Sequence, residues 1–180
     1  MSFNNPFDLL AEYNRCMNER LYHAAGKLDR DTLHADRGAF FGSVFATLDH
    51  LLVADTIWMK RFIEVLPVVP ETAIVRALPH PYTLSGPLHA EFEPLHAARR
   101  RMDSAIVACF AVASDESFMR PLDYTNRTGQ RSIKPFGPLA QHFFNHQTHH
   151  RGQITTLLSQ VGIDVGVTDL ASLVPDLPVS

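Results

Sequence analysis

Residues 138–160 read PLAQHFFNHQTHHRGQITTLLSQ, and this segment is the most informative part of the 180-residue chain. Histidine recurs in it every four residues, at His142, His146 and His150. Residues four apart lie one above the other on one face of an α-helix. Val161-Gly162 follows, and glycine commonly ends a helix. The segment therefore predicts a long helix that begins near residue 135 or 138 and carries a column of imidazoles.

Three further helices are expected upstream, because apolar residues recur there with helical spacing. We expect them over residues 6–27, 39–64 and 88–112, with Phe41 in the apolar stripe of the second. Residues 65–87 hold five of the twelve prolines and predict an irregular crossover, with a helix start at residues 85–87. Pro94 indicates either a kink or a later start of that helix.

A small β-hairpin is expected between the third and fourth helices. Residues 118–133 contain short alternating segments around the turn-forming residues 126–129. The tail carries a possible helical turn at residues 169–173. The chain is thus expected to be an all-α four-helix bundle with one β-hairpin, in a single domain over residues 1–180.

Composition excludes several classes of protein. The chain is 46% hydrophobic and 19% charged, which is too apolar for a disordered protein. Its net charge of -3 gives no basic excess for nucleic acid, and the arginine triplet at residues 99–101 is expected to face solvent. Cys16 and Cys109 are too few for a disulfide scaffold. No signal peptide and no apolar run of about 20 residues is visible, so we expect a cytoplasmic protein without membrane partners.

The histidines of the last helix indicate a metal site. Two imidazoles four residues apart can chelate one ion, but the spacing alone does not choose between His142/His146 and His146/His150. A third ligand must come from elsewhere, and His50 on the second helix is the best candidate. A lone histidine there could equally be a hydrogen-bonded core residue. Asp55, one turn and a half further on, could orient a ligand or make a helix–helix contact.

Three imidazoles leave coordination positions open for water or substrate, as in catalytic metal sites. Imidazole nitrogen suits zinc, nickel, copper or iron. No acidic residue stands at general-base spacing beside the pair, which weakens the case for a hydrolase. His149 lies about 100° round the helix from His150 and should point away from the metal.

Two segments resemble the DinB (damage-inducible) family, namely NHQTHHRGQ at residues 145–153 and HLLVADTIW at residues 50–58. Residues 13–18 and RGAFFGS at residues 37–43 are also typical of it. The resemblance implies a four-helix bundle, often dimeric, with metal ligands at His50, His146 and His150. It also places the chain with YfiT-like metal-dependent hydrolases, whose wider relatives use mycothiol or bacillithiol as S-transferases or isomerases.

The combined expectation is a metal-dependent enzyme that activates water or a thiol cosubstrate, as a hydrolase or a thiol S-transferase. The expected cofactor is a divalent transition metal, namely zinc, nickel or iron, and the expected partners are a small molecule or low-molecular-weight thiol and a second copy of the chain. The alternative is a non-catalytic metal-binding protein of the stress response. Catalytic residues other than the metal ligands are not assigned by the sequence.

Overall fold

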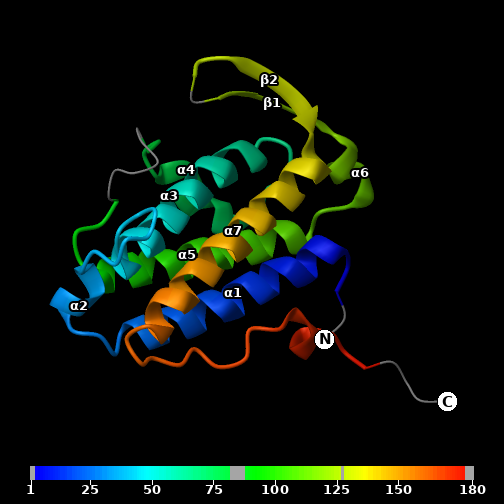
Figure 1. Cartoon of the computed structure of the whole chain (residues 1–180). Helices are drawn as coiled ribbons and strands as arrows, with labels where there is room; N and C mark the ends of the chain where they lie inside the picture. The colour runs from blue at the N-terminus through cyan, green and yellow to red at the C-terminus, as the bar shows by residue number, and fades with distance from the viewer. Residues whose placement is uncertain (1–2, 82–87, 127, 177–180) are drawn as a thin grey trace.

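The computed structural model describes residues 3–81, 88–126 and 128–176. The protein is mostly helical, with a two-stranded antiparallel hairpin (Figure 1). The longest elements of the described chain are four helices of 19 to 24 residues: α1 (Pro6–Ala25), α3 (Val44–Phe62), α5 (Phe92–Ala111) and α7 (Phe136–Ser159).

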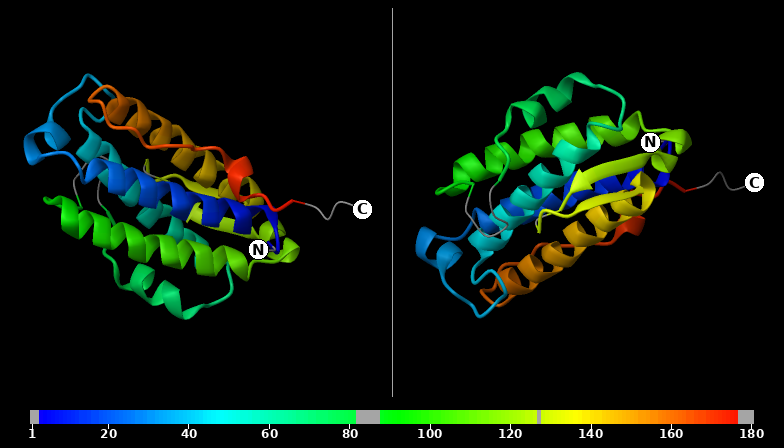
Figure 2. Two further views of the ribbon diagram at one scale, coloured as in Figure 1. Left: turned by 90° about the horizontal axis from the view of Figure 1, so that it is seen from below. Right: turned by 90° about the horizontal axis from the view of Figure 1, so that it is seen from above.

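The four long helices pack around one apolar core. Helix α1 packs against α5 and α7, and α3 packs against the same two helices (Figures 1 and 2). Aromatic side chains fill one end of the core, where Phe62 contacts Phe110, Phe136 and Phe143 with ring centroids 4.9 to 6.3 Å apart. Burying one phenylalanine side chain stabilises the fold by roughly 1.5–3 kcal/mol. Because the four rings come from α3, α5 and α7, their packing stabilises the arrangement of these three helices.

A buried charge network crosses the same core. The Arg99 side chain is 1% exposed and forms ion pairs with Asp55 at 2.5 Å and with Asp103 at 2.9 Å. Asn18 donates a further hydrogen bond to Asp103. Burial raises the pKa of both aspartates to about 6, although Arg99 opposes this. The prediction that Arg99 faces solvent is therefore wrong. Arg99 can be buried because Asp55 and Asp103 supply the carboxylate partners that a buried guanidinium needs.

Several short elements connect the long helices. Between α1 and α3 lies a short helical turn that Asp29 caps by accepting from the Thr32 amide. A second capped turn precedes the hairpin, where Ser114 and Ser117 form a reciprocal capping box. The short elements are α2 (Arg30–His34), η1 (Pro70–Thr72), α4 (Ala73–Ala77), α6 (Asp115–Met119) and η2 (Leu170–Leu173).

Two helix starts differ from the sequence prediction. Helix α3 begins at Val44 and not near residue 39, because Ser43 caps it and Gly42 has a positive φ of 79° that a helix cannot contain. Phe41 therefore lies in the loop before the helix. Helix α5 begins at Phe92, which confirms the later start that Pro94 indicated. The expected start at residues 85–87 lies outside the described residues.

The hairpin pairs β1 (Pro121–Thr125) with β2 (Arg131–Pro135), in a register that places Tyr124 opposite Ser132. Asn126 stabilises the turn, because its side-chain oxygen accepts from the Thr128 and Gln130 amides. Strand β1 contacts α3, and β2 leads directly into α7 (Figure 1). The hairpin prediction is confirmed, although residues 118 and 119 belong to α6.

Within the described ranges, no helix combines the length and apolar character that crossing a bilayer requires.

Candidate metal centre

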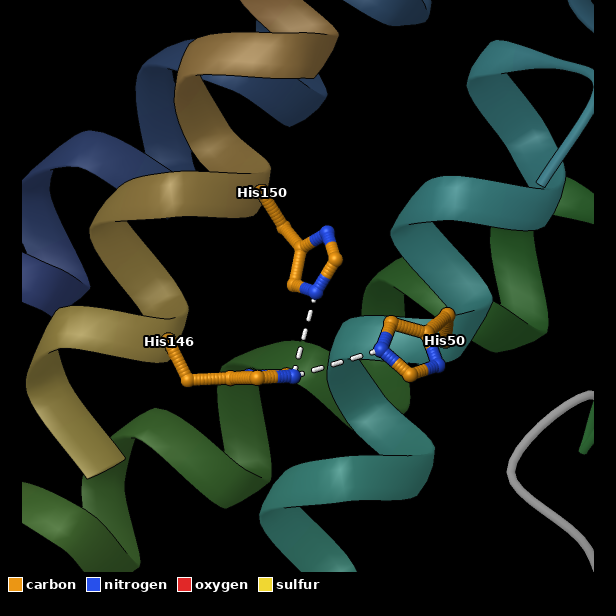
Figure 3. Close-up of side chains that lie close together, drawn as sticks. All are labelled: His50, His146 and His150. Atoms are coloured by element: carbon orange, nitrogen blue, oxygen red, sulfur yellow. Dashed lines mark hydrogen bonds between the residues drawn. The ribbon is translucent and has the colours of Figure 1, made fainter. Parts of the chain in front are cut away.

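Three histidines meet between two packed helices. Helix α3 carries His50, and α7 carries His146 and His150 one turn apart (Figure 3). The three rings point into the space between the helices (Figure 3). His50 and His150 are buried, at 5% and 7% exposed, and His146 is half-buried. The structure therefore brings together the same three residues that the sequence singled out.

The spacing of the ring nitrogens fits a common metal ion. The Nε2 atom of His146 lies 3.1 Å from that of His150 and 3.4 Å from that of His50, and one ligand atom from each residue lies within 4.8 Å of the others. Nitrogens bound tetrahedrally at about 2.0–2.1 Å are about 3.3–3.4 Å apart. The two short separations therefore match ligand–ligand distances around a shared ion.

Hydrogen bonding alone satisfies this cluster poorly. A neutral imidazole nitrogen either donates one hydrogen or accepts on one lone pair. His146 Nε2 has two imidazole nitrogens within 3.4 Å and can form at most one normal hydrogen bond. A cation that accepts all three lone pairs explains the convergence better, so the donor set fits a metal-binding site.

Gln153 sets the tautomer of one candidate ligand. Its side-chain oxygen lies 2.7 Å from Nδ1 of His150 and can only accept, so Nδ1 carries the hydrogen. The lone pair of His150 is then on Nε2, which faces the cluster. The Gln153 amide nitrogen lies 3.3 Å from Nε2 of His149, which holds the glutamine in place. The spacing of three residues between His150 and Gln153 was a sequence signal for this role.

The site keeps His146 and His150 neutral. Burial, followed by the neighbouring histidines, lowers the pKa of His146 to about 3. Burial also lowers the pKa of His150, although the hydrogen bond that His150 donates to Gln153 opposes this. Only neutral imidazole coordinates a metal, so these side chains are ready to bind one at neutral pH.

Phe41 covers one side of the cluster, a role the sequence prediction missed by placing it in a helix. Its ring stacks on His50 with centroids 3.8 Å apart and meets the edge of His150 at 5.5 Å. The apolar ring restrains the orientation of His50 and keeps water from that face.

Other candidates lie outside the cluster. His142 does not join it: the ring is 6.2 Å from that of His146 and packs edge-on against Trp58 at 5.3 Å. The structure thus gathers His146 and His150, and not His142, with His50. Asp55 makes the helix–helix contact with Arg99. His149 is exposed, as expected.

An open pocket of about 360 Å³ adjoins the cluster. His146 belongs to both, so the pocket lies directly beside the histidine cluster. Its other polar and aromatic walls include Trp58, Arg61, Tyr124 and His142.

The fold and the site together define a class of mostly helical proteins in which two packed helices gather three imidazoles at a candidate metal centre. The sequence profile of the DinB family matches residues 1–174, and the chain belongs to the DinB family. It is 25% identical over 161 residues to Protein DinB of Bacillus subtilis (strain 168), a match that covers 89% of this chain and 88% of that protein. No solved structure matches the chain significantly. The family resemblance inferred from the histidine segments is thereby confirmed.

Proposed function

We propose that this protein is a metal-dependent enzyme of the DinB/YfiT-like class, in which His50, His146 and His150 bind one divalent transition metal. The proposal takes residues 1–180 as one domain with the architecture of a four-helix bundle. The observation that carries it is the convergence of one ring nitrogen from each of the three histidines, all within 4.8 Å of one another, beside an open pocket. Zinc, nickel and iron all suit this ligand set.

The surroundings of the cluster support catalysis over a purely structural role. Three protein ligands leave a coordination position open, whereas structural sites usually supply four. The pocket at His146 gives a small molecule access to that position. Phe41 closes the opposite approach at His50, and Gln153 holds His150 in the binding tautomer.

The residues present favour thiol chemistry over hydrolysis. A bound metal would lower the pKa of a coordinated water or thiol and supply a nucleophile at neutral pH. Water attack usually needs a general base, and no described residue lining the pocket is acidic. A coordinated thiol loses its proton without such a base. His142, one helical turn from His146, is the pocket residue that can receive a released proton.

The test is an activity screen of the metal-loaded protein. Purified protein loaded with zinc, nickel or iron(II) is incubated with low-molecular-weight thiols and the electrophile 1-chloro-2,4-dinitrobenzene, and with ester substrates for hydrolysis. We expect metal-dependent thioether formation, in which the thiol sulfur replaces chloride on the ring, and loss of turnover in His150→Ala. A stoichiometric metal with no activity on any thiol or ester would favour the non-catalytic metal-binding role in the stress response.

A further inference from the structure

The pocket beside the histidine cluster has an unusual charged wall. It lies between α3, α7 and the hairpin and is lined by Trp58 and Arg61 from α3, Tyr124 from β1, and His142 and His146 from α7. Its volume of about 360 Å³ falls within the range of small-molecule sites. The pocket is therefore large enough for a compact organic ligand.

Arg61 is held firmly in this wall. The centre of its guanidinium lies 4.8 Å from the ring centroid of Trp58 and 4.6 Å from that of Tyr124. One nitrogen donates to the Thr125 carbonyl at 3.1 Å. Two aromatic contacts and one hydrogen bond orient the group, while most of its five N–H donors remain available.

The charge of Arg61 has no counterpart among the described residues. None of the carboxylates in the described ranges forms an ion pair with it, in contrast to Arg99 and Arg131, which pair with aspartates. No described residue that lines the pocket is acidic. Burial lowers the pKa of Arg61, yet arginine stays protonated in proteins. A half-buried cation without an anionic partner among the described residues favours an anion from solution.

We propose that this pocket binds a small organic carboxylate, whose carboxylate pairs with Arg61 and whose apolar body lies along the apolar walls toward His146. A guanidinium matches a carboxylate in a two-point, planar arrangement, which favours this anion over a spherical one. Ala54, Ile57 and Trp58 supply the apolar walls. The inference deepens the proposed function and rests on it for the chemistry at the metal-facing end.

The chain offers a direct optical readout, because Trp58 is its single tryptophan. Metal-free protein is titrated with benzoate, and with benzamide as the uncharged analogue of the same shape, while Trp58 fluorescence is followed. We expect a saturable change with benzoate and a much weaker response to benzamide. Equal responses to the two compounds would overturn the proposal without any mutation.

Two variants then assign the effect to Arg61. We expect Arg61→Gln to raise the Kd for benzoate by about tenfold or more, since a charge-assisted pair is lost. Lys60→Gln removes the same charge from the adjacent residue, which does not line the pocket, and should leave the Kd within about twofold. Arg61→Lys keeps the charge but loses the forked geometry and should lie between wild type and Arg61→Gln.

The design separates this inference from the proposed metal site. His150→Ala should lose metal yet still bind benzoate, and Arg61→Gln should lose benzoate binding yet keep its metal. If Arg61 only fastens the hairpin to α3, Arg61→Gln will lower the melting temperature but leave benzoate affinity unchanged. That outcome, or benzoate binding that requires zinc and ignores Arg61, would overturn the proposal.

Discussion

The Nδ1 atom of His150 lies 2.7 Å from the side-chain oxygen of Gln153. Gln153 is not part of the histidine cluster, yet this contact determines that Nε2 of His150 faces the cluster. We expect Gln153→Ala to weaken zinc affinity by about 10–100-fold, the usual effect of removing a partner that orients a metal ligand. Competition with a chromophoric chelator measures this affinity. Gln141→Ala, an exposed glutamine on the same helix, is the control. Equal affinities in the two variants would show that Gln153 does not orient His150.

The depressed pKa of His146, about 3, makes the stability of the metal-free protein depend on pH. An unfolded histidine takes up a proton near pH 6.5, whereas folded His146 does not until about pH 3. The contribution of His146 to the stability of the folded state is therefore fully present above pH 6.5 and declines as pH falls toward 3. In chelator, the melting temperature of wild type minus that of His146→Leu should rise from pH 4 to pH 7.5.

Subtracting the melting temperature of His146→Leu removes the pH dependence that comes from Asp55 and Asp103, which has the opposite sign. The pKa values of Asp55 and Asp103 are raised to about 6, so these groups favour the folded state at low pH, but they are common to both proteins and cancel in the difference. A difference that stays constant or falls across this pH range would mean that folding does not lower the pKa of His146.

The buried ion pairs of Arg99 predict a large, local effect on stability. Arg99→Met leaves Asp55 and Asp103 buried without their cation, and breaking such a pair costs roughly 3–5 kcal/mol. The free energy of unfolding in urea measures the loss. Arg100→Met changes the exposed neighbouring arginine and should alter this free energy by less than about 0.5 kcal/mol. Similar values for the two variants would refute the structural role given to Arg99.

The sequence predicted the candidate metal ligands better than it predicted the residues that surround them. Spacing of four residues placed His146 and His150 on one face, but only tertiary packing shows that His50 meets this pair and His142 does not. Arg99 was misjudged because a run of three arginines does not show which one faces inward, although Asp103 four residues later was a usable sign. Phe41 was assigned to a helix on its apolar character, although Gly42 and Ser43 marked the helix start.

A homodimer is the expected assembly, on the basis of the family resemblance and of the prevalence of two-fold dimers among soluble oligomers. Light scattering at micromolar concentration should give twice the chain mass of 20.2 kDa. A mass equal to one chain across the micromolar range would contradict the dimer.

Metal stoichiometry tests the central claim most directly. Wild-type protein, His50→Ala, His146→Ala, His150→Ala and the control His142→Ala are loaded with zinc, desalted and analysed for metal per chain. We expect about one zinc in wild type and in His142→Ala, and a marked loss in the three cluster variants, because two imidazoles rarely hold zinc through desalting. Full retention of zinc by His150→Ala, or its loss from His142→Ala alone, would contradict the assignment of the metal centre.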